Sequence, residues 1–349
     1  MRRSVPATVR VVAPNVMSCD AVGNFAVSVA DFYARNGVPA RVYAAVSHPD
    51  LAGIVAPVGD LDAETITADT LWYHFSTEDV LLPHILSLPW ARRVCYYHNV
   101  TPARWFREAQ PSFADSLDRA RGQLPLLAAF DAVFANSRYS LEEVRPYLAQ
   151  GVSVAVLPPS LDPGRLAALV PEPVALPAVG HTLLWVGRFA PHKRPELALE
   201  LFALVHGILP EVALVLVAGG RQDFPDYAAI VERRIAALPD EARSRLTLLE
   251  NLSEANLAWL YRNCSLLLCT SGHEGYCLPV AEAMSFGLPV AALPQEAVWE
   301  TLGGQGTILR EDPAKAAATI AWLLKQNTGR EIVSRAAQGD ALLRIWDLA

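Results

Sequence analysis

The feature that most constrains the fold is a repeated alternation of short apolar runs with helical stretches. Between the first two runs, helical periodicity passes through Phe25, Val29, Phe32 and Tyr33. Strands separated by helices favour a parallel sheet with right-handed crossovers. In the first half, the strand-like runs are Val9–Pro14, Ala40–Ala45, Thr70–Phe75, Arg93–Tyr97, Ala132–Ala135 and Val152–Leu157.

A proline-rich stretch from Pro158 to Pro177 separates this series from a second one. A chain of 349 residues is long enough for two cores. We therefore predict an α/β chain of two Rossmann-like domains, residues 1–160 and 178–337, with residues 338–349 rejoining the first. In the second series, strands are expected at His181–Val186, Val212–Ala218, Leu246–Leu249, Ser265–Thr270 and Pro289–Leu293.

Charge and composition narrow the class of partner. The formal net charge is −7, whereas a nucleic-acid-binding face is basic. No apolar run reaches the ~18 residues that a membrane span needs. The N-terminus lacks the apolar core of a secretory signal. Five cysteines, an odd number, do not suggest a disulfide framework. We expect a cytoplasmic protein with reduced thiols that does not bind nucleic acid.

One candidate ligand loop follows the strand that ends at Val186. Arg188 and Lys193 lie five residues apart in it, and Pro195 is placed to start the next helix. Two cations beside a helix N-terminus suit a diphosphate, because Arg can pair with two oxygens and Lys supplies a compact charge. By spacing alone, two solvated loop residues would be the simpler interpretation.

A second candidate loop follows the strand that ends at Thr270. Glu274 precedes a tight glycine turn, Pro279 marks a helix start, and Glu282 falls one turn inside that helix. Carboxylates here can accept hydrogen bonds from sugar and ribose hydroxyls. The alternative is that Glu282 only balances the helix dipole. Backbone N–H groups that could meet an anion belong to Gly275, Tyr276, Cys277 and Leu278.

Taken in order, these motifs resemble the GT4 family of retaining glycosyltransferases. Gly187-Arg188 comes first, followed by Lys193 and by Asn251-Leu252-Ser253. The strongest part is His273-Glu274-Gly275-Tyr276-x-Leu278-Pro279-x-x-Glu282-Ala283-Met284. The resemblance implies the GT-B fold, in which two Rossmann-like domains face each other across a cleft.

The same resemblance implies roles for these residues. Arg188 and Lys193 would hold the diphosphate of a nucleotide-sugar donor. Glu274 would bind hydroxyls of the transferred sugar, Glu282 the ribose, and the loop around Leu252 the base. The donor would be a substrate, and the reaction would require no cofactor.

The first half carries two further expected site residues. Gly23 fits the small-residue loop that family members carry after the first strand, although the frequent double glycine is absent. His98, in Tyr97-His98-Asn99-Val100, resembles the family histidine that reaches the donor sugar. A lone histidine at a strand end is more often structural, so this assignment depends on the resemblance.

A zinc site is the competing interpretation for three cysteines and one histidine in the second half. Its ligands would be Cys264, Cys269, His273 and Cys277. The sequence has no C-x2-C knuckle there, and Cys264 and Cys269 are an odd number of residues apart around a strand. We therefore expect no metal.

The function expected from the resemblance is transfer of a sugar, with retention, from GDP-mannose or a UDP-sugar. The acceptor would be a glycan or a lipid-linked saccharide in cell-surface polysaccharide synthesis. Alternatives are a nucleotide-sugar epimerase and a catalytically silent binding subunit. An oxidoreductase is disfavoured because the loop after the first strand lacks G-x-G-x-x-G. A basic stretch leaves peripheral contact with the inner membrane as an option. Its residues are Arg92, Arg93, Arg104, Arg107, Arg119 and Arg121.

Overall fold

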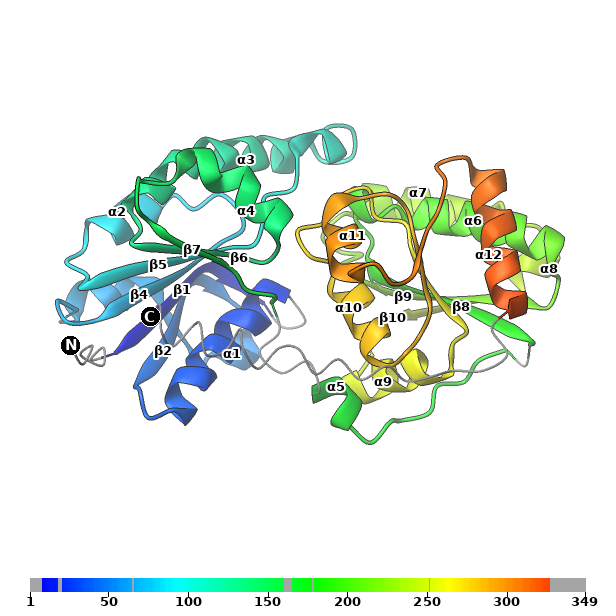
Figure 1. Ribbon diagram of the computed structural model, residues 1–349, viewed down its shortest axis with the longest axis horizontal. Coiled ribbons are helices and arrows are strands. Elements are labelled where there is room, and N and C mark those ends of the chain that lie inside the picture. Colours follow the sequence, from blue (N-terminus) through cyan, green and yellow to red (C-terminus); the bar gives the residue numbers. More distant parts are fainter. Residues whose placement is uncertain are drawn as a thin grey trace. The chain divides into compact units, whose positions relative to one another are not determined.

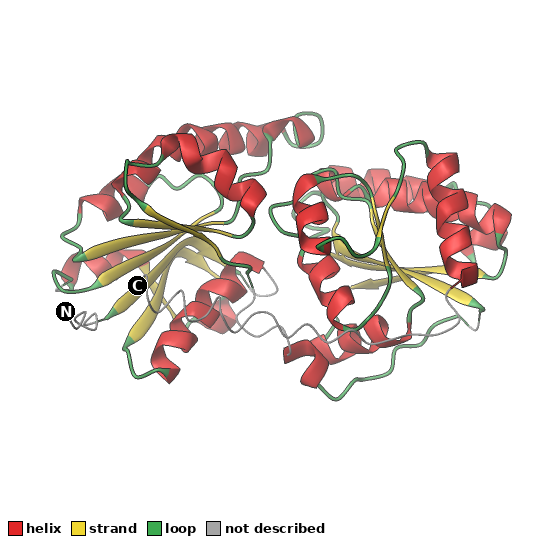
Figure 2. Ribbon diagram, in the orientation of Figure 1, coloured by secondary structure: helices red, strands yellow, loops and turns green. Residues whose placement is uncertain are grey.

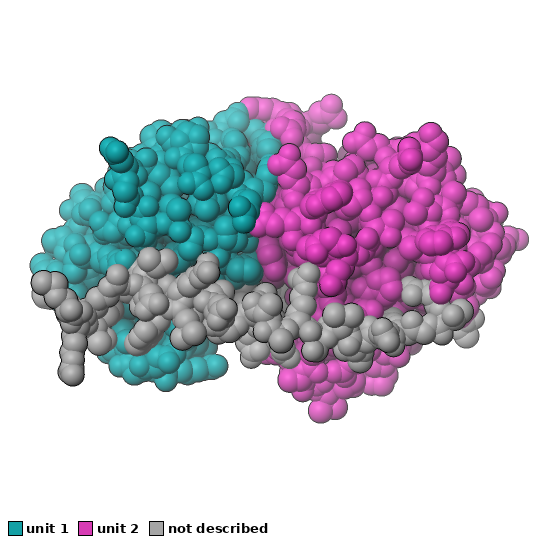
Figure 3. Space-filling view, viewed as in Figure 1, with its two compact units in different colours: residues 1–103, 115–161, 337–349 teal, residues 104–114, 162–336 magenta. Residues whose placement is uncertain are grey.

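The computed structural model describes residues 8–17, 21–64, 66–159, 165–177, 179–250 and 252–326. Within these, two compact units are distinguished by their internal contacts (Figure 3). Of the described residues, the first contains those up to 103 and residues 115–159, and the second contains residues 104–114 and those from 165 to 326. The segment 104–114 thus packs with the second unit although the chain enters it from the first. The expected return of residues 338–349 lies outside the described residues.

The first unit is built on a parallel seven-stranded sheet of order β3-β2-β1-β4-β5-β6-β7 (Figure 1). Figure 1 shows α1 on one face of this sheet and α2 and α4 on the other. The strands are β1 Val9–Val16, β2 Ala40–Ser47, β3 Val55–Pro57, β4 Thr70–Phe75, β5 Arg92–Tyr97, β6 Ala132–Ala135 and β7 Ser153–Val156. The helices are α1 Ala21–Arg35, α2 Leu82–Ser87, α3 Pro111–Gly122 and α4 Arg138–Val144.

The second unit contains a parallel six-stranded sheet of order β10-β9-β8-β11-β12-β13, with helices on both faces (Figure 2). Its strands are β8 His181–Arg188, β9 Val212–Gly219, β10 Leu246–Glu250, β11 Leu266–Cys269, β12 Val290–Ala292 and β13 Thr307–Ile308. Its helices are α5 Arg165–Ala168, α6 Pro195–Ile208, α7 Pro225–Ala236, α8 Asp240–Arg243, α9 Glu254–Asn263, α10 Leu278–Ser285, α11 Glu296–Leu302 and α12 Pro313–Gln326. No helix in the described part of the chain is long and apolar enough to cross a membrane.

Both sheets reverse their winding direction at one point. The chain moves outward from β1 to β2 and β3 and then returns to place β4 on the other side of β1. It does the same at β8, with β9 and β10 on one side and β11 on the other. Ligands of open parallel sheets bind at such switch points, beyond the carboxyl ends of the strands. The loops after β1, β4, β8 and β11 are therefore the places to look for a site.

Most strands expected from the sequence are present within one or two residues. Thr70–Phe75 and Ala132–Ala135 are found with the predicted bounds. The short edge strands β3 and β13 were not predicted, because two or three residues carry too little periodicity. The sequence pattern of residues 330–346 also predicts a helix, and these residues lie outside the described part of the chain.

The core of the first unit gives a stability prediction. Phe134 of β6 is 1% exposed and stacks on Trp72 of β4, with ring centroids 5.3 Å apart. Phe134→Ala should lower the free energy of unfolding by about 3–5 kcal/mol, because it leaves a cavity under the sheet. Urea unfolding followed by circular dichroism measures this change.

Trp322 is the matched control, because it is another large aromatic residue but is 59% exposed on α12. Trp322→Ala should change the unfolding free energy by no more than about 0.5 kcal/mol. A loss of similar size in both variants would contradict the assignment of Phe134 to the core.

Candidate functional site

The strand β8 runs two residues further than predicted, so Arg188 is its last residue and the β8–α6 loop follows it. The loop ends where Pro195 starts α6, as the sequence predicted. Arg194, just before the helix, has left-handed backbone angles with φ 53°. The Thr270 hydroxyl, beyond β11, donates to the carbonyls of Lys193 and Arg194, both at 2.9 Å. These bonds fasten the β8 loop to the β11 loop, so the two loops form one structure.

Lys193 and Glu274 are brought into direct contact by this arrangement. Lys193 Nζ lies 2.6 Å from Glu274 Oε1 and 2.8 Å from Oε2. The side chains are only 18% and 8% exposed. Burial alone would lower the pKa of Lys193, but the Glu274 carboxylate outweighs it and the pKa is raised. Lys193 therefore stays charged inside the fold, held by a buried carboxylate.

Arg188 has a partner that the sequence did not indicate. Its Nη2 lies 2.6 Å from Asp223 Oδ2, and its guanidinium lies 5.4 Å from the ring centroid of Phe224. Gly220, with φ +68°, makes room: a Cβ there would lie 2.7 Å from the Asp223 carboxylate and 3.0 Å from Arg188 Nε. The signal available in the sequence was Gly219-Gly220 at the end of a predicted strand.

The loop from Glu274 to α10 is held by hydrogen bonds from Gln295, the N-cap residue of α11, and from Thr301 on α11. Gln295 Nε2 donates to the Glu274 carbonyl at 3.2 Å, and the Thr301 hydroxyl donates to the Tyr276 carbonyl. Cys277, at the N-cap of α10, has φ 77° and makes no side-chain capping bond. The helix then starts at Leu278 with a proline in its first turn. The predicted helix start beside Glu274 is confirmed.

Glu282 lies on α10 and is bonded to a residue that the sequence reasoning missed. The hydroxyl of Tyr261 on α9 donates to Glu282 Oε2 at 2.7 Å. Burial raises the pKa of Glu282, and this hydrogen bond opposes the shift. The carboxylate keeps a second oxygen for another donor. Tyr261 was missed because no local pattern links a tyrosine to a glutamate 21 residues later.

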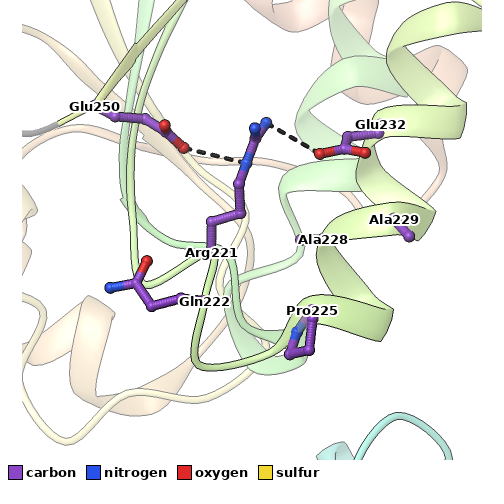
Figure 4. Close-up of a pocket in the computed structure, with 7 residues that line it drawn as sticks. All are labelled: Arg221, Gln222, Pro225, Ala228, Ala229, Glu232 and Glu250. Carbon is purple, nitrogen blue, oxygen red and sulfur yellow. Dashed lines mark ion pairs between the residues drawn. The ribbon is translucent and has the colours of Figure 1, made fainter.

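The loop expected to meet a base follows β10. Ser253 caps α9 by accepting the Asn256 N–H, and Leu252 is half-buried against the core. The preceding Asn251 lies outside the described residues. A pocket of about 340 Å³ opens beside the end of β10 (Figure 4). In it, Arg221 lies 3.2 Å from Glu250 and 3.3 Å from Glu232.

In the first unit, the expected site residues lie in the segments that follow β1 and β5. Gly23 was expected in the loop after β1 but is buried in the first turn of α1, where a Cβ would lie 3.0 Å from the Met17 carbonyl, a tight approach that favours glycine. His98 directly follows β5. Burial lowers the pKa of His98 to about 3, which keeps the ring neutral. His98 Nε2 lies 2.8 Å from Nδ1 of His74, a residue that the sequence analysis did not select.

The cysteines considered as zinc ligands and the arginines of the basic stretch have other neighbours in the structure. Among the described residues, no group of three His, Cys, Asp or Glu side chains is placed to hold a metal. Cys264, Cys269 and Cys277 all lie in one buried apolar cluster. Arg119 lies 2.6 Å from Glu78, and Arg121 lies 2.7 Å from Glu143. These two arginines of the basic stretch thus have carboxylate partners.

Comparison with known proteins identifies the second unit first. Residues 172–340 match the family model described as glycosyl transferases group 1. D-inositol 3-phosphate glycosyltransferase of Xylanimonas cellulosilytica is 29% identical over 205 residues, which cover 56% of this chain and 46% of the relative. GDP-mannose:cellobiosyl-diphosphopolyprenol alpha-mannosyltransferase of Xanthomonas campestris is 31% identical over 146 residues, covering 40% and 36%. The chain spans about half the length, or less, of these curated relatives.

Solved structures match along nearly the whole chain. An alpha,alpha-trehalose-phosphate synthase of Burkholderia vietnamiensis aligns with a TM-score of 0.67 at 15% identity, covering 98% of this chain and 95% of that one. A sucrose-phosphate synthase of Thermosynechococcus elongatus aligns with a TM-score of 0.66 at 15% identity, covering 98% of this chain and 94% of that one. The predicted GT-B fold class is thereby confirmed. Residues 172–340 thus match the glycosyl transferase group 1 family.

Proposed function

We propose that this chain is a retaining glycosyltransferase that uses a nucleotide-sugar donor. The observation that carries the proposal is the buried Lys193–Glu274 pair, held at the switch point of the second sheet beside the start of α10. A lysine whose charge is maintained at such a place suits a diphosphate. A carboxylate beside it suits the hydroxyls of a sugar.

The ion pair gives donor binding a defined consequence. A diphosphate that meets Lys193 competes with Glu274 for the ammonium. The carboxylate that loses part of its partner then accepts hydrogen bonds from sugar hydroxyls, so one event prepares both groups. A diphosphate competes in the same way with Asp223 for Arg188, because Asp223 is an exposed carboxylate on a neighbouring loop.

The chemistry resides in the cations and the leaving group. As the glycosidic bond opens, negative charge grows on the diphosphate, and Lys193, Arg188 and the N-terminus of α10 stabilise it. The leaving diphosphate takes the proton of the acceptor hydroxyl on the same face of the sugar, which retains the configuration. Glu274 holds the sugar in place, Glu282 holds the ribose, and the loop around Leu252 meets the base.

The donor that we propose is GDP-mannose or a UDP-sugar. The acceptor is a glycan or a lipid-linked saccharide in cell-surface polysaccharide synthesis. A relative named for GDP-mannose and a polyprenol diphosphate acceptor supports this choice. Relatives named for D-inositol 3-phosphate support a small phosphorylated polyol as the competing acceptor class.

Removing the lysine tests the proposed chemistry. Lys193→Ala should lower kcat by about 10²–10³-fold, the loss typical of one preorganised donor, and weaken nucleotide binding much less. Transfer is measured by release of free nucleotide, and binding by calorimetry. Circular dichroism verifies that the variant, which leaves Glu274 without its partner, is folded.

Lys315→Ala is the matched control, because Lys315 is an exposed lysine on α12. It should retain the parental kcat. Equal transfer rates for Lys193→Ala and the parent would refute the role of Lys193. A new nucleotide sugar formed from the donor alone would indicate an epimerase instead.

A donor panel tests the nucleotide. GDP-, UDP-, ADP- and dTDP-sugars are compared by thermal shift, because a ligand that binds the folded state stabilises it by mass action. We expect the largest shift from GDP-mannose or a UDP-sugar. Glu282→Gln should reduce that shift, because the carboxylate accepts ribose hydroxyls more strongly than an amide does.

Tyr261→Phe provides the comparison, because it removes the partner of Glu282 and keeps the carboxylate. This variant should retain most of the nucleotide-induced shift. An unchanged shift in Glu282→Gln would contradict the ribose role, and stabilisation by none of the donors would contradict the proposed function.

A further inference from the structure

Two histidines meet at the carboxyl ends of adjacent strands in the first unit. His74 is on β4 and His98 directly follows β5, its parallel neighbour. His74 Nδ1 lies 2.8 Å from His98 Nε2, a hydrogen-bond distance. The two rings lie with their centroids 5.1 Å apart and their planes inclined by 30°. One ring nitrogen of His98 is therefore occupied by His74.

His74 is enclosed by aromatic rings. It is 0% exposed, and Phe25 and Tyr96 each place a ring centroid 5.7 Å from its own. Its second nitrogen, Nε2, is buried and has no hydrogen-bond partner among the described residues. Burial, reinforced by the neighbouring imidazole, lowers the pKa of His74. Within the described part of the chain, the contact with His98 is therefore the one hydrogen bond of the His74 side chain.

The backbone of His98 is fixed as well. Its N–H donates to the Phe75 carbonyl at 2.9 Å, and its carbonyl accepts from Asn136 Nδ2 at 2.7 Å. The ring packs against Tyr96, with centroids 4.6 Å apart. His98 keeps part of its surface exposed, and its Nδ1 bonds to no described residue. That nitrogen is the one left for a ligand.

The contact admits one proton between two neutral rings, so there are two arrangements. If His98 donates from Nε2, then His74 carries its proton on Nε2, a buried N–H without an acceptor. If His74 donates from Nδ1, its buried Nε2 is only an unused acceptor. Orphaned buried N–H groups are rarer than under-used acceptors. The second arrangement is therefore favoured, and it puts the remaining proton of His98 on Nδ1.

We propose that His74 is a positioning residue that fixes His98 as a neutral hydrogen-bond donor through Nδ1, directed at an oxygen of the sugar substrate. The inference deepens the proposed function and rests on it for the identity of the substrate. His74 touches no substrate in this arrangement. It acts by setting the tautomer and the orientation of His98.

Two substitutions at His74 separate the hydrogen bond from the space that the ring fills. His74→Asn keeps an amide N–H near the position of Nδ1, whereas His74→Leu removes the donor. We expect His74→Leu to lower kcat by about 10–100-fold with little change in the donor KM, since misplaced catalytic groups cost on this scale. His74→Asn should recover most of the parental kcat.

Leu71→Ala is the matched control, because Leu71 lies on the same strand β4 and is equally buried. It should lower thermal stability and leave kcat near the parental value. If His74→Leu, His74→Asn and Leu71→Ala all lose activity in proportion to stability, His74 is only a structural residue and the inference is overturned.

A spectroscopic measurement on the unsubstituted chain reports the tautomer without an activity assay. Two-bond ¹⁵N–¹H correlation spectra of histidine-labelled protein report which ring nitrogen carries the proton. We expect Nδ1–H for His98, assigned with His98→Ala, and Nε2–H for His98 would overturn the inference. Nδ1–H together with parental transfer by His98→Ala would instead contradict the expected contact of His98 with the donor sugar.

Discussion

The contact on which the proposed donor site depends is the ion pair between Lys193 and Glu274. Two opposite charges that are mostly removed from water are stable there only because each is the other's main partner. The pair exists because Thr270 fastens the β8 loop to the end of β11. The parallel neighbours β8 and β11 thus determine where the two charges meet. An anion at this site would compete with Glu274 for Lys193, so the Glu274 carboxylate would need new hydrogen-bond donors from the same ligand.

Much of the fold followed from the sequence, because its strands are continuous apolar runs with marked ends. Pairings between distant residues could not follow in the same way. Arg188 with Asp223, Glu282 with Tyr261, and His98 with His74 each join separate elements whose neighbourhood depends on strand order. The sequence motif located Glu274 and Glu282 but could not reveal that Glu274 neutralises Lys193.

The segment 104–114 is a second feature that the sequence did not predict. Its place between the strand at 93–97 and the strand at 132–135 predicted that it would belong to the first domain. Its aromatic residues instead pack in the second unit: Phe106 lies 5.2 Å from Phe224 and 5.5 Å from His192 between ring centroids. Trp105 covers Gly272, where a Cβ would lie 2.1 Å from its ring. The packing of large apolar side chains, rather than chain order, decides to which unit a segment belongs.

The two sheets place different chemistry at equivalent positions. At the switch point of the second, the buried groups are charged and paired, which suits a ligand whose charge increases during reaction. At the carboxyl ends of the first, the buried groups are two imidazoles whose pKa values are lowered by burial, so they stay neutral. The same α/β architecture therefore carries chemically different groups in the two units, because burial selects an ion pair in the second sheet and uncharged hydrogen bonds in the first.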